Sequence, residues 1–523
     1  MTNRKPIPVI DLFAGPGGLG EGFSSILESD GTPLFSLKVS AEKDPTAHKT
    51  LSLRSLYRKF PRGKAPDCYY DHIRGQISRE ELFVHPLAAE AGREALEEAL
   101  NFELGKGDAA EFDRRIANAL GGADDWVLIG GPPCQAYSLA GRSRRTRECL
   151  EKFESDEKHF LYREYLRIIR RHRPAVFVME NVKGMLSSKH GGARIFDRIV
   201  ADLSSPGDGL EYEVRSFVKP GIAQEIDPHD LVIEAERFGI PQGRHRVILF
   251  GIRSDIARSV PELSLAPESF VLGNESHPVY VKEALSGLPP LRSRLSKEPD
   301  SHEQWLSAFS EAVEELRWYE SDALRPVIDE MRNAATNASR NVSTGKPFLP
   351  YDTKSSSMRP KLRQWFIDER LGGVIQHETR AHMRPDLYRY LFAAAYGRIH
   401  NSSPKIADFP TPLLPKHDNV YADSVPFADR FRVQLSTSWS STIVAHISKD
   451  GHYFIHHDPS QCRSLTVREA ARLQTFQDNY YFVGNRTEQY TQVGNAVPPL
   501  LARKVARVVA KFMQAWQKSR LPR

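Results

Sequence analysis

The sequence predicts an α/β protein: a mainly parallel sheet with helices on both faces, plus a second, smaller domain of irregular architecture. Two observations favour this fold. Apolar, strand-like runs alternate with helical patterns through the first half of the chain. After residue 255 the alternation stops, and prolines and arginines become frequent up to residue 434. We therefore expect one layered domain followed by one without regular layers.

Short apolar runs define the expected strands, and a helical pattern at 159–172 separates two of them. Several strands end in unusual residues: glycines after the first, Pro-Pro-Cys after the third and Glu-Asn-Val at the fourth. Ligands bind at the carboxyl ends of strands in such sheets, so we expect the site there. The runs are residues 7–13, 34–44, 125–135, 174–182 and 244–253.

The chain divides into three expected parts. The first is the layered α/β domain, and the second is the irregular domain. The third completes the second and ends in a helix, from about Pro499 to Gln517, that returns to the first. A helical insertion rich in Ala and Glu, at about 76–123, is interpreted as a surface elaboration. The parts are residues 1–255, 256–434 and 435–523.

One helix is expected inside the irregular domain, because four apolar residues recur at helical spacing and share a face. They are Trp305, Phe309, Val313 and Leu316.

Composition limits the class of protein. The 523 residues carry 72 basic and 66 acidic side chains, a formal charge of +6 that leans mildly towards polyanionic partners. Four cysteines without a C-x-x-C pair argue against a disulfide framework and a zinc ribbon, and favour a reducing compartment. The sequence contains no window of about 18 uncharged apolar residues, so no membrane-spanning helix is expected. We expect a cytoplasmic protein without an N-terminal regulatory module.

The first loop contains Gly15-x-Gly17-x-x-Gly20 directly after a strand. This spacing fits the dinucleotide-binding fingerprint, and it fits equally a loop that holds another nucleotide-like cofactor. The loop alone does not choose between them.

Three further positions carry chemistry. Cys134 follows a buried strand and two prolines, where a thiolate is held rigidly at the edge of the sheet. Glu180, at the end of the neighbouring strand, can act as an acid that hydrogen-bonds a substrate ring nitrogen. Arg244 and Arg246 alternate along a strand and share a face, suited to binding a base carbonyl or phosphate and to orienting Glu180.

Together these residues resemble the DNA (cytosine-5)-methyltransferases over nearly the whole catalytic region. Six motifs occur in the order of that family. The resemblance implies the Rossmann-like sheet of S-adenosylmethionine-dependent methyltransferases, with residues 256–434 as the target-recognition domain. The motifs are DLFAGPGG (11–18), PPCQ (132–135), ENV (180–182), QGRHR (242–246), RSLTVREAARLQTF (463–476) and QVGNAVPP (492–499).

The resemblance implies a role for each catalytic residue. Cys134 would add to C6 of cytosine, Glu180 would engage the N3 edge, and Arg244 and Arg246 would support it. The addition makes C5 nucleophilic enough to take the methyl group of S-adenosylmethionine. A cytosine inside a duplex must first be flipped into the pocket.

The resemblance also implies a cofactor pocket. The glycines would let the backbone approach the methionyl part, and Glu42 would accept from the ribose hydroxyls. The Asp-Ile motif of the family is imperfect here, because YDHIRG leaves either Asp71 or His72 to face the adenine. The expected cofactor residues are Phe13, Gly15, Gly17, Gly18, Glu42, Asp71, Ile73, Pro132, Leu161, Asn495 and Val497.

Arginines crowd the segment after Cys134, where the family has a loop that closes over DNA. The stretches 358–366 and 377–390 are basic and aromatic and are candidates to face DNA, although a core helix explains the second equally well. Three histidines in 449–458 are interpreted as part of a strand, and no metal is expected. The expected DNA contacts are Gln135, Ser138, Arg142, Arg144, Arg145 and Gln242.

The leading hypothesis is a monomeric DNA cytosine-C5 methyltransferase of bacterial or phage type, associated with the nucleoid. It would act on double-stranded DNA, with a cognate restriction endonuclease as a possible companion. A cytosine methyltransferase acting on RNA and a catalytically inactive DNA-binding regulator are the alternatives. A nicotinamide-dependent oxidoreductase would leave PPCQ, the arginine pair and GNAV unexplained.

Overall fold

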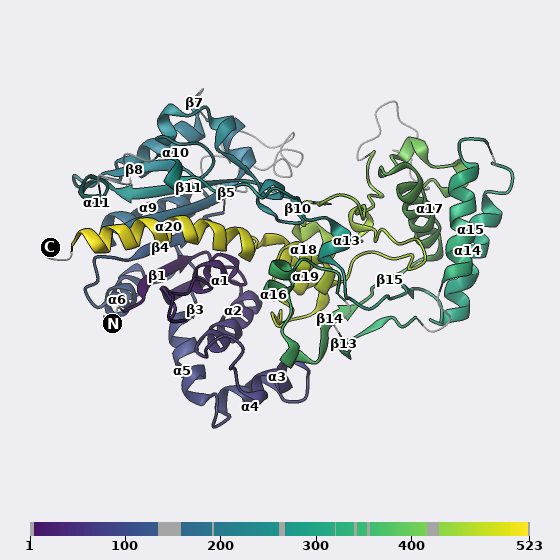
Figure 1. The fold of residues 1–523 in the computed structure, drawn as a ribbon, viewed down its shortest axis with the longest axis horizontal. Helices are drawn as coiled ribbons and strands as arrows, with labels where there is room; N and C mark the ends of the chain where they lie inside the picture. Colours follow the sequence, from purple (N-terminus) through teal and green to yellow (C-terminus); the bar gives the residue numbers. More distant parts are fainter. Residues whose placement is uncertain are drawn as a thin grey trace.

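The computed structural model describes residues 5–133, 158–190, 193–260, 267–319, 321–338, 342–352, 356–415 and 428–520. Figure 1 shows two lobes: a sheet with helices on both sides, and a second, largely helical lobe. The C-terminal helix lies along the sheet lobe, and both marked ends of the chain lie on the side of that lobe away from the second one. None of the helices in these ranges is long and apolar enough to cross a membrane.

The sheet of the first lobe has the order β3-β2-β1-β4-β5-β11-β8, with β9 paired to β11. Strands β3 to β5 in this order pair in parallel, whereas β11 runs antiparallel to its neighbours. The five expected strands are confirmed as β1, β2, β4, β5 and β11, and the sheet also contains β3, β8 and β9, which were not expected. The ranges are β1 Ile7–Leu12, β2 Phe35–Glu42, β3 Ala99–Asn101, β4 Val127–Gly130, β5 Val176–Val182, β8 Tyr212–Ser216, β9 Val232–Glu234 and β11 His245–Arg253.

Helices cover both faces of the sheet, which explains why its central strands read as continuous apolar runs. One core contains side chains of α1, α11 and α20, and the opposite core contains those of α6, α9 and α10. The ranges are α1 Gly18–Ser24, α6 Ala109–Leu120, α9 Lys158–His172, α10 Ile195–Ser204, α11 Ser254–Ser259 and α20 Pro499–Ser519.

The C-terminal helix returns to the first lobe, as the sequence predicts. It packs closely on α1, because a Cβ atom at Gly22 would collide with the Cβ of Ala502. Only glycine permits this approach of the two helices.

The expected insertion at 76–123 is more than a surface elaboration. It contains β3, the edge strand of the main sheet, which pairs with β2, and α6, which covers one face of that sheet. The sequence shows no sign of β3, because three residues are too few to display a period. The remaining helices of this region and the ones before it are α2 Pro45–Arg58, α3 Asp67–Ile73, α4 Arg79–Val84 and α5 Ala89–Glu98.

The second lobe is more regular than expected. Three helices enclose a core in which Trp305, Phe309 and Leu316 are buried and Val313 is partly buried, so the predicted helical face is confirmed. Small two-stranded sheets, including β12–β15 and β13–β14, accompany them. The ranges are α14 His302–Glu315, α15 Arg325–Asn337, α17 Arg384–His400, β12 Arg294–Leu295, β13 Gly345–Pro350, β14 Gly373–Glu378 and β15 Ala381–His382.

The two basic and aromatic stretches are largely core. In 358–366, Leu362, Trp365 and Phe366 are buried on α16 (Pro360–Phe366). In 377–390, Leu387 and Tyr390 are buried on α17. Their apolar residues make helix-packing surfaces, so the core-helix interpretation is the one that fits.

The predicted strand at 449–458 is wrong. A short 3₁₀ helix, η13 His452–Phe454, occupies it, and Ile455 makes isolated bridges to Val433 and Ser464. Among the described residues, no group of His, Cys, Asp or Glu side chains is arranged to hold a metal ion.

Buried histidines should make the folded protein less stable in acid. Burial lowers the pKa of His377 and His457 to about 4, and lowers the pKa of His382 and His456 well below the ordinary value. These groups are neutral in the folded protein but bind protons when the chain unfolds below pH 6.5. Stability should therefore fall as the pH drops from about 6.5 towards 4.

Asp11 has the opposite effect, because burial raises its pKa to about 8. Its carboxyl group binds a proton in the folded protein and not in the unfolded chain, so the folded state gains stability as the pH falls from 6 to 5. We expect a net loss of roughly 3–4 kcal/mol in the free energy of unfolding between pH 6 and pH 5. Urea denaturation at the two pH values measures it. Equal free energies of unfolding would contradict the assignment of neutral buried histidines.

Candidate active site

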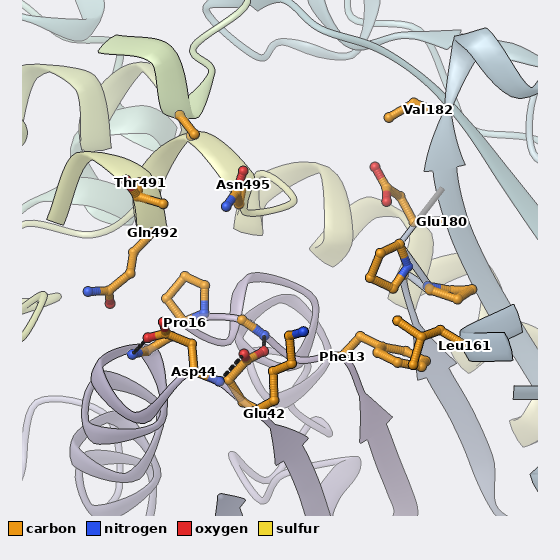
Figure 2. A pocket seen from close by; sticks show the side chains of 18 of the residues that line it. Phe13, Pro16, Glu42, Asp44, Leu161, Glu180, Val182, Thr491, Gln492 and Asn495 are labelled. Carbon is orange, nitrogen blue, oxygen red and sulfur yellow. Dashed lines mark hydrogen bonds between the residues drawn. The ribbon is translucent and has the colours of Figure 1, made fainter. Parts of the chain in front are cut away.

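A pocket of about 470 Å³ opens at the carboxyl ends of β1, β2, β4 and β5. Figure 2 shows three groups of side chains converging on it: the glycine loop with Glu42, the end of β5 with Glu180, and α19 (Arg486–Asn495). The pocket therefore combines the sheet with a segment more than 400 residues downstream of the glycine loop.

Glu42 and the glycine loop form the floor of the pocket. The backbone N–H of Gly15 donates to Glu42 Oε2 at 2.8 Å, and that of Asp44 donates to Oε1 at 2.8 Å. Asp44 itself caps α2 by accepting from the backbone N–H groups of its first turn. Burial raises the pKa of Glu42. The carboxylate is thus fixed in place beside the loop, with Phe13 alongside (Figure 2).

The other two predicted glycines serve packing and do not line the pocket. Gly17 has φ +101°, a conformation that favours glycine, and a Cβ at Gly18 would collide with the carbonyl oxygen of Val497. Val497 closes against this loop from outside the pocket, whereas Asn495, on the last turn of α19, lines it.

Asp71 and Ile73 are not brought to the pocket. The Asp71 carboxylate pairs with Arg74 at 3.4 Å, and Ile73 is buried among apolar side chains of the layer formed by α2 to α5. His72 contacts the carbonyl of Ile77 instead of the pocket. The motif YDHIRG is therefore a structural helix, α3, and neither of its candidate residues is placed to face an adenine.

Phe102 and Leu104 line the pocket just after β3, where the sequence did not suggest a site. No signal in the sequence pointed to them, because the three residues of β3 are too few to show a strand period. Leu161, on α9, lines the neighbouring wall as predicted from the family motif.

Glu180 and Arg246 face each other across the β5–β11 ladder. Arg246 Nε lies 2.9 Å from Glu180 Oε1, and the two side chains are largely buried, with 15% and 13% of their surfaces exposed. A Cβ at Gly131 would lie 3.0 Å from Glu180 Oε2, so the glycine leaves room for the carboxylate. The pair places a carboxylate and its counter-charge at the wall of the pocket.

Arg244 differs from the prediction in one respect. It lies just before β11 instead of on it, and its buried guanidinium donates from Nη1 to the carbonyls of Ile443 (3.0 Å) and Gly494 (3.2 Å). Burial, together with the charge of Arg246, lowers the pKa of Arg244 well below its ordinary value. Arg244 therefore links the catalytic sheet to α19 while lining the pocket.

Gln242 is not available to DNA. Its side chain is fully buried, donates to the carbonyl of Leu473 at 2.9 Å and accepts from the backbone N–H of Ile443 at 3.1 Å. An amide with both ends satisfied inside the protein has no free group for a phosphate or a base. Gln242 is a structural link between the lobes.

The remaining predicted residues lie next to the described part of the chain or outside it. Pro132 and Pro133, directly before Cys134, line the pocket beside Glu180. The buried Asn181 side chain donates to the carbonyl of Pro132 at 3.4 Å. Outside the described residues are Cys134, Gln135, Ser138, Arg142, Arg144 and Arg145.

Comparison with known proteins identifies the family. The model of C-5 cytosine-specific DNA methylases matches residues 94–511. Type II methyltransferase M.Bpa9945I of Bacillus paralicheniformis is 33% identical over 517 residues, covering 96% of this chain and 98% of its own. Type II methyltransferase M.AgeI of Thalassovita gelatinovora is 26% identical over 521 residues, covering 96% and 98%.

The fold is shared with a solved structure from a prophage (E. coli) that carries the name of a DNA modification methyltransferase. It has a TM-score of 0.50 at 18% identity and covers 97% of this chain and 99% of that chain. The family match over most of the length and the relative at 33% identity lead to one conclusion. The chain belongs to the C-5 cytosine-specific DNA methylase family.

Proposed function

We propose that this DNA (cytosine-5)-methyltransferase methylates C5 of a flipped-out cytosine in a specific duplex sequence, through a covalent adduct between Cys134 and C6. The observation that carries the proposal is the Glu180–Arg246 pair, which shares one pocket with the glycine loop and with Pro132–Pro133. A carboxylate for the base, a loop for the cofactor and the approach to Cys134 thus meet at one place.

The residues of the pocket fit S-adenosylmethionine, the cofactor of this family. The fixed carboxylate of Glu42 suits ribose hydroxyls, and Phe102, Leu104 and Phe13 offer apolar surface for the adenine. The backbone at Gly15 and the Asn495 side chain line the remainder. When bound, S-adenosylmethionine supplies an electrophilic methyl group.

The protein's own residues perform the rest of the reaction. The Cys134 thiolate forms a bond to C6, and the electron pair displaced from the ring moves towards N3, where Glu180 holds a proton. Arg246 keeps the Glu180 side chain in position. C5 takes the methyl group while the N3 proton returns to Glu180. The C5 proton then passes to solvent water, and the electron pair of the C5–H bond forms the C5=C6 bond and expels Cys134 as the thiolate, which breaks the S–C6 bond and restores the aromatic ring.

The biological setting follows from the relatives. Their names are those of type II methyltransferases, so we infer a restriction–modification role, with a cognate endonuclease encoded in the same system. We further propose that the enzyme acts as a monomer on double-stranded DNA at the nucleoid in the cytoplasm.

Glu42 lines the pocket and Asp71 does not, and binding measurements can test this difference. Glu42→Ala should weaken S-adenosylmethionine binding roughly tenfold to a hundredfold, because hydrogen bonds to a charged group are lost. Asp71→Ala should leave binding unchanged, since that carboxylate pairs with Arg74 away from the pocket. Isothermal titration of the two variants measures this. A larger effect at Asp71 than at Glu42 would reverse the assignment.

A methyl-transfer assay on DNA and on tRNA tests the proposed function directly. Labelled S-adenosylmethionine is offered with unmethylated duplex DNA and, in parallel, with tRNA, and Cys134→Ser serves as the inactive comparison. We expect label in cytosine of DNA only, and none with Cys134→Ser. Sequencing of methylated cytosines in cells that express the protein then gives the target. Label in tRNA alone, or no 5-methylcytosine in any DNA context, refutes the proposal.

A further inference from the structure

Trp439 is an ordered aromatic side chain that remains 40% exposed. The tryptophans Trp126, Trp305, Trp365 and Trp516 are buried in cores, whereas Trp318 is 81% exposed beyond the end of α14. Trp439 directly precedes β16 (Ser440–Ser441), which pairs in parallel with β10 (Gln242–Gly243). The pairing of β16 with β10 therefore holds the backbone of Trp439 beside the QGRHR motif.

The indole is held against a glycine. A Cβ at Gly243 would lie 3.3 Å from Trp439 Nε1 and 3.4 Å from Cδ1, so the missing side chain lets the ring lie close to the strand. Thr442 Oγ1 donates to the carbonyl of Gly243 at 2.6 Å, and the Ser440 backbone N–H donates to that of Pro241 at 3.0 Å. The hydrogen bonds hold the backbone around Trp439 against β10, and the indole lies beside Gly243 with 40% of the residue exposed.

Trp439 does not line the pocket, but the residues on either side of its contact with Gly243 connect it to the pocket wall. Gly243 immediately precedes Arg244, which lines the pocket, and Val444 and Ala445, a few residues after Trp439, line it too. Val444 is itself 38% exposed. The segment from Trp439 to Ala445 thus runs from an exposed aromatic surface to the wall of the catalytic pocket.

We propose that Trp439 stacks on a nucleobase of the DNA beside the flipped cytosine and so positions the duplex over the pocket. The inference rests on the proposed function, since it requires that DNA enters this pocket. Flipping a base removes the stacking partner of its neighbours, and a fixed indole replaces that partner. Stacking tolerates any base, so Trp439 contributes to affinity for the duplex and leaves the choice of sequence to other residues.

Steady-state kinetics with unmethylated plasmid DNA tests the proposal. Trp439→Ala should raise the KM for DNA roughly tenfold or more, with the KM for S-adenosylmethionine unchanged. Trp439→Phe should restore most of the loss, because it keeps an aromatic face. Trp318→Ala is the matched control and should behave as wild type.

Each outcome decides one question. A Trp439→Ala variant with an unchanged KM for DNA overturns the stacking role while leaving the proposed function intact. A Trp439→Phe variant as impaired as Trp439→Ala also overturns it, since a local structural defect would explain both. A wild-type enzyme that methylates tRNA and not plasmid DNA refutes the proposed function, and the inference with it.

Discussion

A Glu180→Gln variant is expected to lose roughly a hundredfold to ten-thousandfold in kcat, the range typical of removing a general acid. The amide is nearly the same shape as the carboxyl group but cannot hold and return a proton at N3 of the base. Charge that develops on the ring after the attack of Cys134 then has no acid to receive it. Binding of S-adenosylmethionine should be unchanged, because Glu42 and the glycine loop, to which we assign that cofactor, lie on the other side of the pocket.

The geometry also predicts that this variant folds. The amide oxygen of the substituted side chain can still face Arg246, and the β5–β11 ladder around it is made by backbone groups. Single-turnover methyl transfer into duplex DNA measures the chemical step, and thermal denaturation checks the fold. An unchanged single-turnover rate would refute the role of Glu180 as the acid.

Glu213→Gln is the matched control. Glu213 lies on β8 of the same sheet and also pairs with an arginine, Arg215, at 2.5 Å, but it is not in the pocket. Its replacement should leave the rate of methyl transfer unchanged. Equal losses in the two variants would point to a general weakening of the sheet.

The sequence could predict the residues that stand at strand ends. Phe13, Glu42 and Glu180 follow or close buried apolar runs, and parallel strands bring their carboxyl ends to one edge whatever the intervening loops do. Asn495 is different, because only the family motif, and no local pattern, connects it with the glycine loop. Its place in the pocket depends on α19 packing across the lobes.

Buried polar contacts were the hardest feature to predict. The sequence made Gln242 a candidate DNA contact and placed Arg244 beside Glu180, but no local pattern shows that backbone carbonyls of distant segments hold both side chains in the interior. Burial of a polar side chain depends on partners that only the tertiary fold supplies. The pocket wall at Phe102 and Leu104 was missed because β3 is too short to show a period. The letters of YDHIRG resemble a motif, but the segment lies on and just after α3, and its residues do not line the pocket.

The largest expected effect on stability comes from Glu469, which lies with Arg463 in the interior at the start of α18 (Val467–Leu473). Both residues are about 1% exposed, and the guanidinium donates two hydrogen bonds of 2.7 Å to the two carboxylate oxygens. Burial alone would raise the pKa of Glu469, but Arg463 holds it well below its ordinary value. The carboxylate is therefore ionised at neutral pH, and it supplies the counter-charge for the buried guanidinium of Arg463.

Glu469→Gln should lower the free energy of unfolding by roughly 3–5 kcal/mol, because it leaves a buried guanidinium without its counter-charge. The effect extends beyond α18, since Arg463 also donates to the carbonyl of Leu291 in the second lobe. Urea denaturation at pH 7 measures the change. Glu81→Gln is the control: Glu81 occupies the same third position of a capping box, on α4, but at the surface, so its loss should be small. Similar losses in the two variants would mean that capping, and not the buried charge pair, sets the contribution of Glu469.

Joint replacement of both partners by apolar residues, Arg463→Met with Glu469→Leu, separates the loss of the ion pair from the cost of leaving one buried charge unpaired. It removes the uncompensated charge and should recover part of the stability that Glu469→Gln loses.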